Sequence, residues 1–141
     1  MKNIELESLI FDFLTAAEDS LVLLERKFGS RSLLALWREK KIEQRGELSP
    51  GISYQLHGRG CMIEYPEFCI DFDYGPNERT DGFDAWRLYN YACEFPEKYQ
   101  KYTDLKIVEA ELNQYAQIKK IKKIDNSSSD LYFLEHNQQP L

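Results

Sequence analysis

The fold follows from an alternating run, Phe68-Cys69-Ile70-Asp71-Phe72-Asp73-Tyr74, in which apolar and polar side chains take turns. This period of two is typical of a β-strand with one buried face and one polar face. Two earlier runs, residues 53–57 and 61–65, have the same β-prone character. The separators, Gly58-Arg59-Gly60 and Pro66-Glu67, are short enough for tight turns. The three runs therefore predict a small antiparallel meander.

Helical periodicity flanks these strands on both sides. Residues 4–28 and 31–45 predict a helical hairpin, which Gly46 and the Ser49-Pro50-Gly51 turn would end. Residues 83–94 and 103–123 predict two further helices, the first capped by Thr80 or Asp81. We expect their buried faces to carry Phe83, Trp86, Tyr89 and Cys93 in the first helix and Leu105, Val108, Leu112 and Tyr115 in the second.

The expected fold class is thus α+β, with an N-terminal helical hairpin, a three- or four-stranded antiparallel meander and two further helices packed on one face of the sheet. Residues 1–125 would form one domain. Residues 126–141 would form a polar linker and tail, with residues 131–134 available as an edge strand.

Composition narrows the class of protein. The 141 residues include 43% hydrophobic and 30% charged side chains, which is typical of a soluble globular chain. The start, Met1-Lys2-Asn3-Ile4-Glu5-Leu6-Glu7, has acids where a signal peptide would be basic and apolar. The three cysteines form no CxxC and cannot all pair within the chain. We therefore expect a cytoplasmic protein with reduced thiols and no membrane span.

The net charge of −6 is concentrated in the middle of the chain, because residues 51–100 hold nine acidic and four basic side chains. Such a field repels nucleic acid and attracts a basic protein partner. We expect that partner to contact seven acidic residues: Glu64, Glu67, Asp71, Asp73, Glu78, Asp81 and Asp84. Alternatively, Arg59 and Arg87 hold Asp71, Asp73 or Asp84 as structural pairs. Tyr65, Tyr91, Tyr99 and Tyr102 are further candidates for a binding surface.

A second hypothesis is a small enzyme or metal-binding domain built on His57, Cys61, Asp71 and Asp73. A cysteine beside a histidine can serve as a thiol nucleophile, and the aspartates could orient the imidazole or ligate a metal ion. However, no zinc or calcium spacing is present, and buried unreactive cysteines are common. We therefore expect no catalytic residue, cofactor or metal, and we keep an adaptor module as a third possibility.

Three motifs resemble a small bacterial domain family of uncharacterised function: His57-Gly58-Arg59-Gly60-Cys61, Ile70-Asp71-Phe72-Asp73-Tyr74-Gly75 and Gly82-Phe83-Asp84-Ala85-Trp86-Arg87-Leu88. The resemblance covers residues 53–90, with Tyr74 where the pattern has Phe. Such families resemble the immunity proteins of polymorphic or contact-dependent toxin systems. The resemblance implies a non-enzymatic protein that binds and neutralises a cognate toxin domain, for which a basic nuclease is one candidate.

Overall fold

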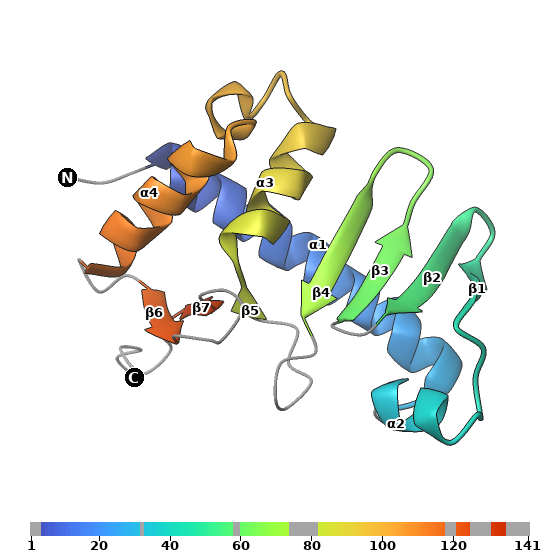
Figure 1. The fold of residues 1–141 in the computed structure, drawn as a ribbon. Coiled ribbons are helices and arrows are strands. Elements are labelled where there is room, and N and C mark those ends of the chain that lie inside the picture. Colours follow the sequence, from blue (N-terminus) through green and yellow to red (C-terminus); the bar gives the residue numbers. More distant parts are fainter. Residues whose placement is uncertain are drawn as a thin grey trace, which may run out of the picture. The chain divides into compact units, whose positions relative to one another are not determined.

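The computed structural model describes residues 4–31, 33–57, 60–73, 82–117, 121–124 and 131–134 (Figure 1). In chain order the elements are α1 (Ile4–Phe28), α2 (Leu33–Arg38), β1 (Arg45–Ser49), β2 (Ile52–His57), β3 (Gly60–Glu64), β4 (Cys69–Asp73), β5 (Gly82–Phe83), α3 (Ala85–Glu94), the 3-10 helix η1 (Gln100–Tyr102), α4 (Leu105–Gln117), β6 (Ile121–Ile124) and β7 (Leu131–Leu134). This confirms the α+β class. The chain divides into two compact units. One unit is Leu14–Thr80, and the other combines Met1–Phe13 with Asp81–Leu141.

Helix α1 has the bounds that its periodicity predicts. Its first turn carries Glu5 and Glu7, and its last turn carries Arg26 and Lys27, so both ends complement the helix dipole. Gly29 ends the helix with a positive φ of 76°, and its N–H donates to Glu25 O at 2.8 Å. Within the described residues, no helix is both long and apolar enough to cross a bilayer.

The unit Leu14–Thr80 is built around a four-stranded antiparallel sheet of order β1-β2-β3-β4. Residues that pair across neighbouring strands point to the same face of the sheet, and the register therefore gathers the apolar side chains of β2, β3 and β4 on one face. The α1 segment of this unit contacts that side: the Phe28 and Tyr54 rings meet edge to face at 5.3 Å, and Ser20 Oγ lies 2.6 Å from Tyr65 OH. The buried residues of this apolar face are Tyr54, Leu56, Cys61, Ile63 and Ile70.

The predicted second helix, residues 31–45, is wrong beyond its first two turns. Helix α2 ends at Arg38. Two residues later Lys40 takes a positive φ of 60°, and the N–H of Lys41 donates to Leu36 O at 2.8 Å, as at a helix C-terminus. Residues 45–49 instead form β1, which pairs with β2 across the predicted Pro50-Gly51 turn. The pairing of β1 with β2, which is irregular between Glu47 and Ser49, depends on a neighbouring strand and is not detected by local helix propensity.

The other unit contains α3, η1, α4 and a second antiparallel sheet of order β5-β7-β6. Residues 121–124 form β6 rather than the end of the predicted helix 103–123, which stops at Gln117. Residues 131–134 do form a strand, but β7 lies between β5 and β6 rather than at an edge. The proposed domain boundary after residue 125 lies outside the described residues and stays a prediction.

The buried face of α3 differs from the predicted one. Leu88, Tyr91 and Ala92 are buried, whereas Trp86 is 55% exposed and Cys93 is also exposed. The predicted stripe is confirmed for Phe83, which is completely buried in β5, and is wrong for Trp86 and Cys93. Helix α3 carries apolar residues on two opposite faces, and periodicity cannot tell which of them meets the core.

Tyrosines contribute strongly to the core of this unit. Phe13 meets the Phe83 and Tyr91 rings edge to face, with centroids 6.3 and 5.9 Å apart. The hydroxyls of Tyr99 and Tyr102 reach carboxylates, Tyr99 OH donating to an Asp12 oxygen and Tyr102 OH to a Glu111 oxygen. Burial and, to a smaller extent, the Asp12 charge raise the pKa of Tyr91 to about 12. Tyr91, Tyr99 and Tyr102 are therefore core residues, and only Tyr65 of the four candidate tyrosines is partly exposed.

Candidate functional site

The candidate site is the polar face of the four-stranded sheet. On β2, β3 and β4 its residues are Ser53, Gln55, His57, Met62, Glu64, Cys69 and Asp71, and β1 adds the exposed Arg45 and Glu47, which pair with Gln55 and Ser53. Pairing places Gln55, Met62 and Asp71 in one row across β2, β3 and β4, and Ser53, Glu64 and Cys69 in the next. All seven are half-buried or exposed, in contrast to the buried apolar face behind them. This is the one-sided alternation that the sequence predicts.

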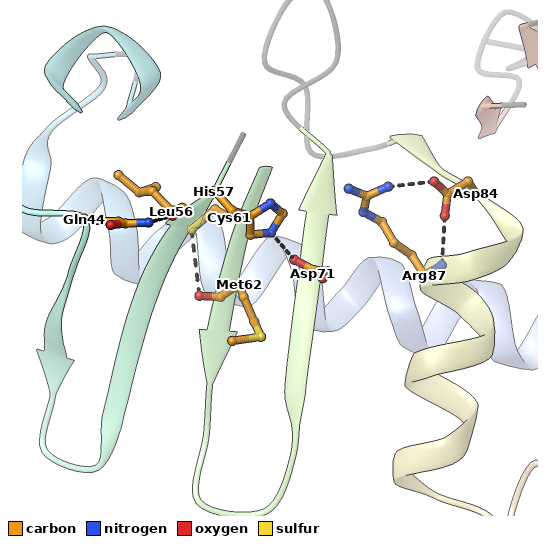
Figure 2. Close-up of polar contacts among 8 residues, drawn as sticks. All are labelled: Gln44, Leu56, His57, Cys61, Met62, Asp71, Asp84 and Arg87. Carbon is orange, nitrogen blue, oxygen red and sulfur yellow. Dashed lines mark hydrogen bonds and ion pairs between the residues drawn. The ribbon is translucent and has the colours of Figure 1, made fainter. Parts of the chain in front are cut away.

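A hydrogen-bonded pair joins two strands across this face. Figure 2 shows the His57 imidazole, at the end of β2, reaching Asp71 on β4, with Nε2 and Oδ1 3.0 Å apart. The strand between them, β3, places Gly60 opposite His57. Because glycine has no side chain, the imidazole can pass above that position. The sequence analysis missed this role of the His-Gly-x-Gly-Cys motif, whose second glycine puts a residue without a side chain opposite His57 on β3.

The pair leaves an imidazole nitrogen for other contacts. The side chains of His57 and Asp71 are 38% and 29% exposed. When a carboxylate accepts a proton from Nε2, the neutral ring has its lone pair on Nδ1. The arrangement can therefore accept a hydrogen bond from a bound molecule or take up its proton.

Cys61 lies on the other face of the sheet from His57. It pairs with Leu56, the neighbour of His57, and successive side chains of a strand point to opposite sides. Cys61 is completely buried, and this burial raises its pKa to about 12, with a smaller contribution from the Asp71 charge. The structure therefore places Cys61 and His57, the two residues of the hypothetical cysteine–histidine pair, on opposite faces of the sheet. Within the described part of the chain, no group of three or more His, Cys, Asp or Glu side chains could hold a metal ion.

Of the seven acidic residues predicted to contact a partner, three lie on β3, on β4 and in the turn between them. Glu64 is exposed at the end of β3, Glu67 is exposed in the turn that follows, and Asp71 is half-buried on β4. Asp73 ends β4 in register with Gly60. The predicted residues Glu78 and Asp81 lie outside the described residues, as does Arg59.

Asp84 has a structural use in the second unit. Its Oδ1 accepts the Arg87 N–H at 2.8 Å and caps α3, while Oδ2 lies 2.7 Å from an Arg87 guanidinium nitrogen (Figure 2). The two side chains are only 8% and 10% exposed. This is the Arg87 pairing foreseen as the alternative to partner contact. The cap is Asp84 itself, not Thr80 or Asp81, which lie outside the described residues.

A hollow of about 590 Å³ lies in the same unit, and its lining includes Lys98 and Lys101. Both lysines already face carboxylates, since Lys98 Nζ is 2.8 Å from Asp12 and Lys101 Nζ is 2.6 Å from Glu111. A side-chain hydrogen bond to Glu111 raises the pKa of Lys101. The lysines are thus neutralised within the unit, and this hollow is not an anion site.

Comparison with known proteins identifies the family. The chain matches the family described as "Domain of unknown function (DUF6896)" over residues 6–134, a span that contains α1 from its third residue on, both sheets and every candidate residue above. Neither the curated proteins nor the solved structures include a match. Because the family match covers most of its length, the chain belongs to the DUF6896 family.

Proposed function

We propose that this protein binds a basic protein through the polar face of its four-stranded sheet, and that it acts as an immunity protein blocking a bacterial toxin domain. The observation that carries the proposal is the division of that sheet. Its apolar face is buried, and its polar face presents Glu64 and Asp71, with Glu67 in the adjoining turn. Acids gathered on an accessible sheet face suit a binding surface for a basic partner.

Charge supports a fast-binding role. The nine acids against four bases in residues 51–100 create a negative field that speeds the approach of a basic surface. Electrostatic steering can raise association rates to about 10⁸–10⁹ M⁻¹s⁻¹, and an immunity protein needs fast binding because the toxin acts until it is bound. Toxin nucleases are basic where they hold phosphates, so the carboxylates would occupy phosphate positions.

The location of Cys61 supports a non-enzymatic role. A cysteine nucleophile needs an accessible thiolate beside its histidine, but Cys61 is buried on the face opposite His57. On the polar face, the imidazole and carboxylate are joined to each other and can both contact a partner.

The test is binding to the C-terminal toxin domain encoded beside this gene, by calorimetry and stopped-flow at low and high salt. We expect nanomolar affinity, loss of toxicity, and association slowed at least about tenfold by Glu64→Lys with Asp71→Lys. Glu18→Lys with Asp19→Lys is the matched control, because both are exposed on α1 and the change in net charge is equal. Equal slowing by both pairs would show that net charge matters and not this face. No binding would refute the proposal.

One observation favours a second candidate, a small enzymatic or metal-binding site at the His57–Asp71 pair. A carboxylate on one imidazole nitrogen is the usual way to orient a general base or a metal-ligating histidine. Zinc titration followed by imidazole nitrogen NMR separates the candidates. A saturable shift at His57 that Asp71→Asn weakens would favour this site, and no shift would favour protein binding alone.

A further inference from the structure

We propose that the basic end of the four-stranded sheet binds the acidic end of the same sheet on a second copy of the chain, so that copies associate head to tail. The acidic end carries Glu64 and Asp71, on the face already proposed to meet a toxin. The inference uses that face but does not rest on the toxin as its partner. The basic end is the surface of Arg38, Lys40, Lys41 and Arg45.

The first step is a local excess of positive charge. Residues 26–45 hold seven basic and two acidic side chains, although the whole chain has a net charge of −6. Glu39, one of the two acids, is already paired, because Arg31 Nη2 donates to both of its carboxylate oxygens at 3.0 Å. The four residues of the basic end are exposed and form no ion pair within the part of the chain that the structure describes. They are therefore available to an acidic partner.

The second step is the position of this charge on the sheet. Strands β1 and β4 are the two edges, and Figure 1 shows the segment after α2 leading into β1. Gln44 ties that segment to β2. Its carbonyl oxygen accepts the Leu56 N–H at 2.7 Å, and its Nε2 donates to Leu56 O at 3.0 Å (Figure 2). The basic end is thus held at the β1 edge by hydrogen bonds.

The third step is the separation of the two ends. One row of the polar face starts at Arg45 on β1 and ends at Asp71 on β4, and Gln55 and Met62 lie between them in register. Three strand spacings put roughly 14 Å between the two ends of this row. Exposed charges that far apart are largely screened at physiological salt, where the Debye length is about 8 Å. The two ends therefore do not neutralise each other within one copy.

The fourth step is the choice of occupant. A positive surface attracts either a nucleic acid or an acidic protein surface. Phosphates that approached the basic end would also meet Glu47 on the same edge strand and the acids farther along the face, which disfavours nucleic acid. The acidic end of a second copy is complementary to the basic end. Since the two ends lie at opposite edges of one sheet, the contact is heterologous and can repeat from copy to copy.

The test is sedimentation velocity of the full chain over a range of protein concentrations. A salt concentration of about 0.1 M suits it, because a Debye length of about 10 Å spares direct contacts and screens the net charge of each copy. We expect the sedimentation coefficient to rise with concentration for the unmodified chain. It should stay constant for Arg38→Glu with Lys41→Glu, whose two ends are both acidic, and for Glu64→Lys with Asp71→Lys, whose acidic end becomes basic.

An equimolar mixture of these two variants should associate again, because each end then finds an end of opposite charge on the other variant. The reversals change the net charge of −6 by four, to −10 in the first variant and −2 in the second, so no overall attraction draws them together. Failure of the mixture to associate would overturn the proposal. Glu67→Lys, in the exposed turn, replaces Asp71→Lys if circular dichroism shows that this variant is unfolded.

The matched control is Glu18→Lys with Asp19→Lys, which also has a net charge of −2 and alters two exposed acids of α1. It should associate like the unmodified chain, because both ends are intact. Loss of association in this control would mean that net charge matters and not the two ends, and would refute the proposal.

Two further results separate the alternatives. A chain that stays monomeric but binds a duplex oligonucleotide through Arg38 and Lys41 would assign the basic end to nucleic acid and overturn the proposal. Toxin binding by a chain that stays monomeric at every concentration would refute this inference and leave the proposed function standing. Self-association through the two ends without toxin binding would do the reverse.

Discussion

Cys61 should be the least reactive thiol of the chain. Burial raises its pKa from 9.0 to about 12. Since only the thiolate reacts with an alkylating agent, three pKa units lower its reactive fraction about a thousandfold at neutral pH. The side chain is also fully buried, so the reagent must wait for the sheet to open. We therefore expect alkylation of Cys61 to be at least about a thousandfold slower than that of the exposed Cys93.

The assay is a time course with iodoacetamide at about pH 8, quenched and mapped by peptide mass spectrometry. Cys93 should react first, the half-buried Cys69 second and Cys61 last. In urea all three should react at similar rates, which controls for local sequence. If folded Cys61 reacts within about tenfold of Cys93, its thiolate is accessible, the burial argument fails and the cysteine–histidine enzyme hypothesis returns.

Three further predictions concern stability. Above pH 9 the thiol of Cys61 loses its proton in the unfolded chain, whereas in the folded chain it keeps the proton until about pH 12. Between these two pH values Cys61 alone should lower the free energy of unfolding by about 1.4 kcal/mol per pH unit. Urea titrations at several alkaline pH values measure this loss, and Cys61→Ala should show a shallower slope. Asp84→Ala should cost about 3 kcal/mol, because it removes the α3 cap and a largely buried ion pair to Arg87. Asp84→Asn, which retains a capping oxygen, should cost less, and equal costs would contradict this account. Gly46→Ala should cost about 1–3 kcal/mol in thermal unfolding, because its Cβ would lie 2.9 Å from Tyr54 Cε1; an unchanged midpoint would mean that the ring can move.

Parts of the fold could be predicted because one local signal dominated them. Helix α1 repeats its apolar residues over seven turns and ends at a glycine, so both bounds follow from the sequence. The strands β2, β3 and β4 alternate, and their connections are too short for anything but hairpins. In these segments the hydrophobic period and the turn residues indicate the same structure, and the tertiary packing agrees with both.

The errors arose where local signals were ambiguous. Residues 45–49 contain Gly46 and no alternation, so only pairing with β2 makes them a strand. Residues 121–124 follow a helical pattern, but pairing with β7, the next strand along the chain, makes them a strand. Helix α3 has two apolar faces, and the tertiary packing on Leu88 and Tyr91 decided which one became the core.

The candidate site divides in the same way. The sequence by itself determined that Asp71 and Cys69 share a polar strand face and that the middle of the chain is acidic, because period two and charge act locally. Only the tertiary structure decided that His57 reaches Asp71 across a third strand, that Cys61 faces the opposite side, and that Trp86 points outward. These depend on strand register and on which helix face meets the core, and both are set by packing between segments far apart in the chain.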